Sequence, residues 1–246
     1  MSKTVLVTGS AKGIGASIIK ELAKEGYNTV INYLTSSKEA IALRDYCLSL
    51  NVKSIAIKAD ISKEEDVKYL FDEIKNEFGG VDILVNNASV DLSDFYNKKD
   101  VSVFKKTLDV NLIGAYMVSR YAYPYMKEKK WGRIINISST NGINTYYPIS
   151  LEYDASKAAL NSLTHNLAIE YSPYVTVNAI APGFIGTESE LDGYDSELLK
   201  IETDKILLKR YGKPEEVAHL VKFLISDEAS YINNSIIRID GGHLNS

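Results

Sequence analysis

Near its N-terminus the chain contains the run Thr4-Val5-Leu6-Val7-Thr8-Gly9-Ser10-Ala11-Lys12-Gly13-Ile14-Gly15. A short apolar and β-branched segment leads straight into three closely spaced glycines. Apolar residues then recur at helical spacing, at Ile14, Ile18, Ile19, Leu22 and Ala23. This order predicts a strand, a tight turn and a helix, which together form the first half of a βαβ unit.

The glycine-rich turn has the features of a phosphate-binding loop. Gly9 permits a tight turn, Gly13 lets the backbone approach a pyrophosphate, and Gly15 allows the helix to pack closely on the strand. The N–H groups and the dipole at the helix start then hold the anion. A plain glycine-rich turn is the alternative, because the spacing is Gly-x3-Gly-x-Gly. The loop residues expected at the cofactor are Gly9, Ser10, Lys12, Gly13, Ile14 and Gly15.

Strand-like and helix-like segments alternate along the rest of the chain. The expected strands are Thr4–Val7, Thr29–Asn32, Ser54–Ile57, Ile83–Val85, Ile134–Ile137, Val175–Ile180 and Ile236–Ile239. Parallel neighbours need crossover helices, so this alternation predicts a single-domain α/β fold of Rossmann type. We expect a doubly wound parallel sheet of about seven strands with helices on both faces, spanning residues 1–246. The long connection at about 184–210 is expected to be a substrate lid, and an ordinary surface excursion is the alternative.

Composition excludes several classes of function. The 246 residues carry a net charge of −4 without a dense Lys/Arg block, which disfavours a nucleic-acid partner. No apolar run approaches the ~20 residues that span a bilayer, and the N-terminus lacks a signal-peptide pattern. Cys47 is the single cysteine, so no intrachain disulfide forms, and we expect a cytoplasmic protein with no membrane partner. The three histidines lack metal-ligand spacing, so no metal site is expected.

The second expected strand bears on the choice of cofactor. An NAD site usually presents a carboxylate about 20 residues after the glycines, where it binds the ribose 2′-hydroxyl. Residues 26–38 contain no acidic residue, and the strand ends in Asn32 and Tyr33. Lys12 and Ser36 or Ser37 are positioned in the sequence to meet a 2′-phosphate instead. The pattern favours NADP(H) over NAD(H), with a solvated loop lysine as the alternative for Lys12.

Tyr153 and Lys157 form the candidate catalytic pair. Four residues apart at the expected start of a helix, they share one helix face. A nearby ammonium lowers the pKa of a phenol from its reference value of ~10. Such a phenol can protonate the alkoxide that forms when a carbonyl receives a hydride. The pair alone is weak evidence, because the chain has 17 tyrosines.

Taken together, the motifs resemble those of the short-chain dehydrogenase/reductase family over essentially the whole chain. The resemblance implies that Asp60 and Ile61 hold the adenine and that Asn87 and Ala88, after Asn86, line the cofactor site. It implies that Asn111 holds a water of the proton relay and that Ser139 hydrogen-bonds the substrate oxygen. Tyr153 and Lys157 match the catalytic pair of the family. It also implies contacts to the nicotinamide carboxamide from Pro182, Gly183, Ile185 and Thr187. Late family signatures are matched at 210–218 and 240–242.

Three departures from the family pattern stand out. Ser89 and Asn234 replace usual glycines, and asparagine tolerates the left-handed conformation better than most residues. The interval from Ser139 to Tyr153 is one residue longer than expected, which predicts a loop insertion at about 146–151.

The expected helix from Val101 to about Glu128 carries several tyrosines, which pack either on a partner chain or in the subunit core.

The resemblance is strongest to 3-oxoacyl-(acyl-carrier-protein) reductases, which implies an acyl-thioester substrate, a place in fatty acid biosynthesis and a homotetramer. Five acidic residues argue against an acidic carrier if they face the entrance: Glu188, Glu190, Asp192, Asp195 and Glu197. Reduction of a small-molecule ketone, sugar, steroid or quinone therefore stays open. A non-catalytic dinucleotide-sensing regulator is the remaining alternative, disfavoured because Asn111, Ser139, Tyr153 and Lys157 are all present.

Overall fold

The structure, a computed structural model, describes residues 2–92, 94–95, 98–187 and 196–244, with the backbone alone at 196–199. Its centre is a sheet of seven parallel strands. These are β1 (Thr4–Val7), β2 (Asn28–Tyr33), β3 (Ser54–Lys58), β4 (Ile83–Asn86), β5 (Gly132–Ile137), β6 (Val175–Pro182) and β7 (Ile236–Ile239). All seven predicted strands are present, with ends that shift by one or two residues. The predicted fold class is confirmed.

The strand order explains where a site can form. The sheet runs β3-β2-β1-β4-β5-β6-β7, so β1 pairs with β2 on one side and with β4 on the other. The chain reverses its direction of travel across the sheet between β1 and β4. In open α/β sheets, the crevice outside the carboxyl ends of the strands at such a switch point is where ligands bind. Gly9 follows β1 and Asn87 follows β4 at this point.

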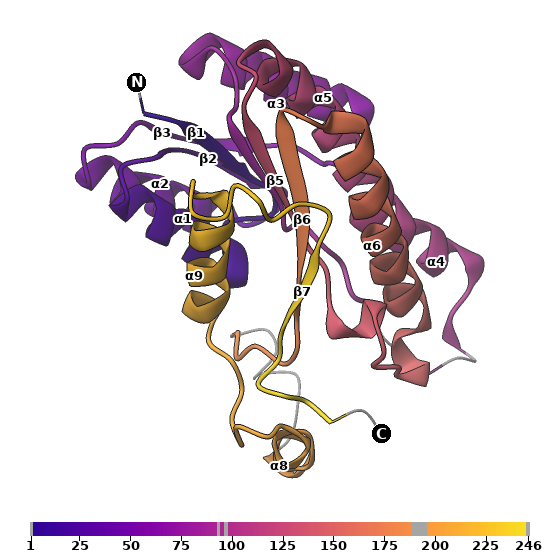
Figure 1. The fold of residues 1–246 in the computed structure, drawn as a ribbon. Coiled ribbons are helices and arrows are strands. Elements are labelled where there is room, and N and C mark those ends of the chain that lie inside the picture. The colour runs from indigo at the N-terminus through magenta and orange to yellow at the C-terminus, as the bar shows by residue number, and fades with distance from the viewer. Residues whose placement is uncertain (1, 93, 96–97, 188–195, 245–246) are drawn as a thin grey trace.

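Helices cover both faces of the sheet (Figure 1). On one face lie α1 (Gly13–Lys24), α2 (Ser37–Ser49) and α9 (Pro214–Ile225), and on the other lie α3 (Glu64–Phe78), α4 (Val101–Leu108), α5 (Ala115–Glu128) and α6 (Leu151–Tyr171). Each layer has its own apolar core. Ile18, Leu22 and Val221 belong to the first, and Leu70, Ile74 and Met126 to the second. The central strands β1, β4 and β5 are buried on both faces, as expected for a parallel sheet, whereas the edge strands β3 and β7 are only partly buried.

The long helix predicted from Val101 to about Glu128 is interrupted by a different kind of turn. Residues Asp109–Gly114 are π-helical and join α4 to α5. A Cβ at Gly114 would lie 2.8 Å from the Ile61 side chain, so the helix passes close to the connection between β3 and α3 here. Single π turns are frequent at functional sites. This one contains Asn111.

The tyrosines of α5 pack mainly within the subunit. Tyr121 and Tyr125 lie against Phe71, and Tyr123 stacks on Tyr171 at a centroid distance of 3.9 Å. Tyr116 remains exposed. Three of the four tyrosines therefore pack against the subunit core, and packing on a partner chain stays a prediction.

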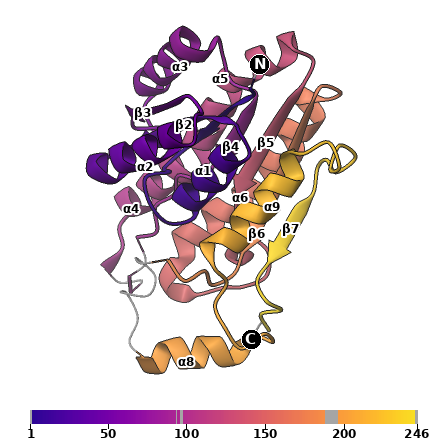
Figure 2. The same ribbon diagram turned by 90° about the vertical axis from the view of Figure 1, so that its left-hand side faces the viewer.

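The segment expected to be a lid contains one described helix, α8 (Ser196–Lys205). In both ribbon views α8 lies beside the C-terminal segment, away from the sheet (Figures 1 and 2). The backbone explains this: Ile206 and His243 form an antiparallel bridge, and Leu244 N donates to Lys205 O at 2.9 Å. Within the described ranges, no helix has the length and apolarity needed to cross a membrane.

Candidate active site

The glycine-rich loop is shaped by contacts that only glycine permits. Gly9 has φ +59°, in the left-handed region, and a Cβ there would lie 2.7 Å from Ala88 Cα. A Cβ on Gly15 would lie 2.6 Å from Asn87 Nδ2 and 2.7 Å from Ser10 Cα. Real Cβ atoms do not approach other atoms this closely, so any larger residue would push the loop away from β4. Lys12 precedes α1 without capping it through its side chain, so the helix start faces the loop.

The motif after β4 cross-links three strands at their carboxyl ends. Thr8 Oγ1 accepts hydrogen bonds from the N–H groups of Asn87 and Ala88, both at 3.0 Å. Asn87 Nδ2 donates back to the carbonyls of Thr8 and Gly9. Asn86 Nδ2 donates to Asn136 Oδ1 on β5. These bonds hold the crevice between β1 and β4 at a fixed width.

A first cavity of about 370 Å³ lies on the β2 side of the switch point. Of the residues expected at the cofactor, it is lined by Gly9, Lys12, Asn32, Tyr33, Ser36, Asp60, Ile61, Asn87 and Ala88. The Asn32 side chain bonds other parts of the cavity wall: its Oδ1 accepts from Gly9 N, and its Nδ2 donates to Ala59 O. The Asp60 carboxylate likewise bonds the protein itself, since it accepts from Ser62 N and Ser62 Oγ.

Lys12 has an acidic neighbour that the sequence spacing did not reveal. Its Nζ lies 2.9 Å from Glu39 Oε1, and both side chains are about half exposed. The Lys12 ammonium, through its hydrogen bond, lowers the pKa of the Glu39 carboxyl. Residues 26–38 contain no carboxylate, but the next residue, Glu39, lies in the first turn of α2, which brings its carboxylate to Lys12 beside the first cavity. A 2′-phosphate at Lys12 would therefore compete with Glu39.

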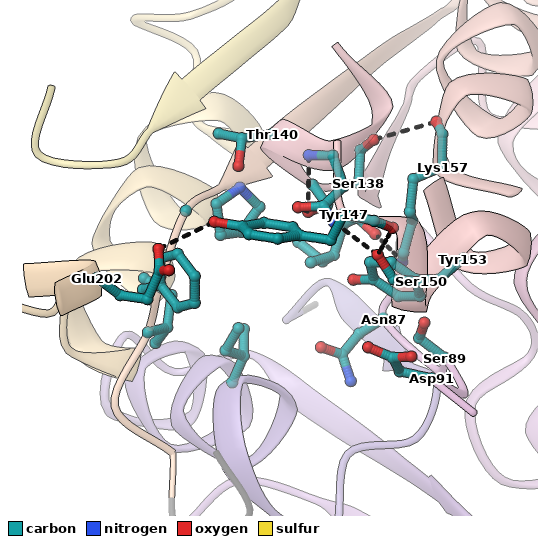
Figure 3. Close-up of a pocket in the computed structure, with 18 of the residues that line it drawn as sticks. Asn87, Ser89, Asp91, Ser138, Thr140, Tyr147, Ser150, Tyr153, Lys157 and Glu202 are labelled. Atoms are coloured by element: carbon teal, nitrogen blue, oxygen red, sulfur yellow. Dashed lines mark hydrogen bonds between the residues drawn. The ribbon is translucent and has the colours of Figure 1, made fainter. Parts of the chain in front are cut away.

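A second cavity of about 440 Å³ opens on the β5–β6 side (Figure 3). Of the predicted site residues, it is lined by Ile14, Asn87, Ser139, Tyr153, Lys157, Pro182, Gly183 and Ile185. Asn87 and Ser89 line both cavities, so the two spaces adjoin across the end of β4. Ser138 lines the second cavity as well, and its Oγ donates to Lys157 O at 3.3 Å. Ser139 accepts the Asn141 N–H instead.

Lys157 is buried in the floor of the second cavity. Its Nζ donates to Ile137 O at 2.9 Å and lies 5.4 Å from the centroid of the Tyr153 ring. Burial lowers the pKa of Lys157 to about 8, and the charge of Asp91 opposes this shift. An ammonium has three N–H donors, so Ile137 leaves capacity for ligand oxygens. The i, i+4 spacing on α6 thus becomes a phenol and an ammonium facing one space.

Asn111 lies behind this floor, lining neither of the two cavities. Its Oδ1 accepts from Val90 N at 2.8 Å, and its Nδ2 donates to Val90 O and to Ser156 Oγ. Both amide hydrogens are thereby used. The π turn aims Asn111 at the segment after β4 and at α6, and so ties the two together. Its expected contact with a relay water stays a prediction.

The longer interval before Tyr153 forms an ordered loop rather than a bulge. The loop contains two short 3₁₀ turns, Thr140–Gly142 and Pro148–Ser150, and residues in and next to these turns converge on Asp154. The buried Asp154 carboxylate accepts from Asn141 Nδ2 at 2.7 Å, from Ser150 Oγ at 2.8 Å and from Tyr147 N at 3.1 Å. The residue after Tyr153 thus fixes the loop that leads into it.

Several cavity residues were not predicted from the sequence. Tyr147, Phe184, Asp91 and Glu202 line the second cavity, and Tyr147 Oη donates to Glu202 Oε2 at 3.0 Å. None of them belongs to a spacing pattern, because the loop, β6 and α8 bring them together only in three dimensions.

The remaining expected site residues lie outside the two linings. Ser10, Gly13 and Gly15 form the backbone turn itself, and Ser10 Oγ donates inward to Val7 O. Thr187 lies over the loop, since a Cβ on Gly13 would be 3.5 Å from Thr187 Cγ2. The acidic side chains of the segment expected to be a lid, from Glu188 to Glu197, lie outside the described residues.

Asn234 and Ser89, which replace glycines of the family pattern, behave differently. Asn234 has φ +60°, so the expectation that asparagine serves there in the left-handed conformation is confirmed. Ser89 is not among the described residues with positive φ, so serine fits that position without strain.

The site fits a nicotinamide dinucleotide. The glycine-rich loop keeps its close backbone approach only while Gly9 and Gly15 carry no Cβ, and α1 begins directly after this loop. One of the two cavities lies on each side of the loop, as a dinucleotide requires. Asn87 and Ser89 at the junction make the two cavities one continuous site. Across the described ranges, no group of three or more His, Cys, Asp or Glu residues is arranged to hold a metal ion.

Comparisons with known proteins agree with this geometry. A family described as enoyl-(acyl carrier protein) reductase matches residues 9–243. The chain is 35% identical to glucose 1-dehydrogenase 2 of Bacillus subtilis, covering 98% of this chain and 94% of the relative. It is 37% identical to a Staphylococcus aureus 3-oxoacyl-(acyl-carrier-protein) reductase, covering 98% of each, and 37% identical to an Eggerthella lenta 3β-hydroxysteroid dehydrogenase, covering 98% and 93%.

Solved structures agree as well. A double mutant of a Serratia marcescens short-chain dehydrogenase/reductase superposes with a TM-score of 0.92 at 34% identity, covering 98% of this chain and 97% of that one.

Proposed function

The chain belongs to the short-chain dehydrogenase/reductase family of oxidoreductases, which act on alcohol and ketone groups, and we propose that it reduces a ketone to a secondary alcohol with NADP(H). The observation that carries the proposal is the buried Lys157 ammonium 5.4 Å from the Tyr153 ring, in the floor of the second cavity. Tyr153 is the proton donor in this proposal.

The chemistry divides between the cofactor and the chain. When bound, the nicotinamide supplies or accepts the hydride. Ser139 hydrogen-bonds the substrate oxygen, and Tyr153 delivers its hydroxyl proton to that oxygen as charge develops on it. Lys157 favours the phenolate that remains and orients ribose hydroxyls, while Ile137 O holds its Nζ in place. Pro182, Gly183, Ile185 and Thr187 hold the carboxamide side.

NADP(H) is the proposed cofactor because Lys12 and Ser36 border the first cavity and residues 26–38 lack a carboxylate. Glu39 weakens this preference, since its salt bridge must yield to a 2′-phosphate. Fluorescence titration of the protein with NADPH and with NADH tests the proposal. We expect tighter binding of NADPH, and equal or tighter binding of NADH would overturn the assignment.

Two substrate classes are candidates. The relative named 3-oxoacyl-(acyl-carrier-protein) reductase supports a 3-oxoacyl thioester, and with it a role in fatty acid biosynthesis. The relative named glucose 1-dehydrogenase 2 supports a small hydroxylated substrate. Glu202 and Tyr147 in the cavity wall favour this second class, because an acyl chain offers them no hydrogen bond.

The proposal is tested by changing Tyr153→Phe. NADPH oxidation is followed with acetoacetyl-CoA, small ketones, ketoses, steroids and quinones as substrates. We expect the variant to bind NADPH as the wild type does and to lose turnover by about 10²-fold or more. Activity retained in the variant, or no turnover by the wild type with any substrate, would argue for the dinucleotide-sensing alternative.

We also propose that the chain assembles as a homotetramer. Ile113 and Tyr116 near the π turn, Ile169 on α6 and Phe223 on α9 are apolar or aromatic side chains that remain exposed in the single subunit. Surfaces of this kind are typical of interfaces between copies. Light scattering coupled to size-exclusion chromatography measures the assembled mass, and a monomeric mass would contradict the proposal.

A further inference from the structure

Glu202 occupies an unusual position for a charged side chain. It extends from α8 into the wall of the second cavity, and Figure 3 shows it on the side opposite Tyr153 and Lys157. Its side chain is only 15% exposed. Tyr147 Oη donates to its Oε2 at 3.0 Å, and Lys205 Nζ donates to its Oε1 at 2.8 Å. The carboxylate is thus held in one orientation by two different elements.

The C-terminal segment keeps this carboxylate in place. The bridge between Ile206 and His243 and the hydrogen bond from Leu244 N to Lys205 O tie α8 to the end of the chain. His243 Nε2 lies 3.8 Å from Glu202 Oε2, so its buried ring is a further neighbour of the carboxylate. Glu202 therefore does not depend on a substrate for its position.

The carboxylate retains capacity for another donor. A carboxylate accepts about four hydrogen bonds, and Tyr147 and Lys205 supply two. A bound apolar group would exclude water from this wall without replacing its hydrogen bonds, which is unfavourable. A hydroxyl group would replace them. Of the described lining residues Lys157 is cationic and Asp91 and Glu202 are acidic, and Lys205 compensates the charge of Glu202, so the lining offers an anionic substrate no surplus of positive charge.

We infer that Glu202, oriented by Tyr147, is a specificity-determining residue that accepts a hydrogen bond from a hydroxyl group of the substrate. The substrate is then a small ketone that carries a hydroxyl group away from its carbonyl. This inference rests on the proposed function, because the carbonyl must lie at Tyr153 while the hydroxyl reaches Glu202. The wall is built for a neutral hydroxylated compound rather than for an acyl chain.

Matched pairs of ketones test the inference. Each hydroxyketone is compared with the ketone in which a methyl group replaces the hydroxyl: hydroxyacetone with butan-2-one, 4-hydroxybutan-2-one with pentan-2-one, and 5-hydroxypentan-2-one with hexan-2-one. The readout is kcat/KM from NADPH oxidation. We expect one pair at least to favour the hydroxyketone by about 10- to 100-fold, the range for a hydrogen bond to a charged group.

Variants then assign the preference to one side chain. Glu202→Leu removes the acceptor and is expected to bring the ratio within the best pair to about threefold or less. Glu202→Gln keeps the shape and a weaker acceptor, so its ratio should be intermediate. Asp204→Asn is the matched control, since it removes one charge from the exposed side of the same helix, away from the cavity. It should keep the wild-type ratio.

The outcomes separate this inference from the proposed function. Ketone reduction without a hydroxyl preference, or a preference that survives in Glu202→Leu, overturns the role of Glu202 and leaves the reductase proposal intact. Turnover of acetoacetyl-CoA but of none of the small ketones also overturns the role of Glu202 and leaves the reductase proposal intact. No turnover with any of these compounds overturns both.

Discussion

The charge of Lys157 is expected to cost stability, and Lys157→Met measures that cost. The ammonium is fully buried beneath the second cavity, and burial lowers its pKa from 10.5 to about 8. Between these two values the unfolded chain binds a proton at this lysine that the folded chain releases. Stability therefore rises as the pH rises through this window. Methionine keeps the length and packing of the side chain and does not titrate.

The size of the effect follows from the two pKa values. At pH 7 holding the lysine charged costs the folded state about 3 kcal/mol, and at pH 9.5 about 1.5 kcal/mol. Losing the hydrogen bond to Ile137 O and changing the packing add terms that depend little on pH. The difference in unfolding free energy between the variant and the wild type should therefore shrink by about 2 kcal/mol from pH 7 to pH 9.5.

Urea unfolding at one fixed protein concentration provides the measurement, with both proteins at both pH values. Lys20→Met on the exposed face of α1 is the control, and its difference from the wild type should not change with pH. A Lys157→Met difference that is equally large at pH 7 and pH 9.5 would refute the reasoning, because it would mean that burial does not shift this group.

Turnover is expected to depend on pH in the opposite direction. In the proposed reaction Lys157 acts in its charged form, so kcat for the wild type should decline as the pH rises above about 8. The decline reports the Tyr153–Lys157 pair rather than either group alone. Constant kcat up to pH 10 would contradict the role of the ammonium.

Two further changes test other parts of the site. Glu39→Gln frees Lys12 from its salt bridge, so it should tighten NADPH binding by about 3-fold without affecting NADH binding, whereas Lys12→Ala should weaken NADPH binding. Fluorescence titration at low salt measures both effects, and equal effects on the two cofactors would count against a 2′-phosphate site at Lys12. Asp154→Ala removes three hydrogen bonds from the loop before Tyr153, so we expect a loss of about 2 to 4 kcal/mol in unfolding free energy and a raised KM. Unchanged urea unfolding and an unchanged KM would show that the loop is held by other contacts.

The fold and the backbone of the cofactor site were predictable because their causes are local. A β-branched run, closely spaced glycines and the helical spacing after them lie within about twenty residues, whereas the contacts that exclude a Cβ at Gly9 and Gly15 come from Ala88 and Asn87 after β4. Each recurs along the chain with the period of its element. The same applies to Tyr153 and Lys157, since one helical turn places them on one face wherever the helix lies.

Only the tertiary structure decided which side chains share the second cavity and what charges they meet. Glu202 reaches Tyr147 across 55 residues, Glu39 reaches Lys12 across α1 and β2, and the pKa of Lys157 depends on its burial and on the charge of Asp91. These contacts leave no periodic pattern, because they depend on how strands and helices pack rather than on how residues follow one another. The sequence by itself determined the architecture and the placing of the candidate catalytic pair on one helix face, whereas packing determined the charges around that pair and the cavity wall opposite it.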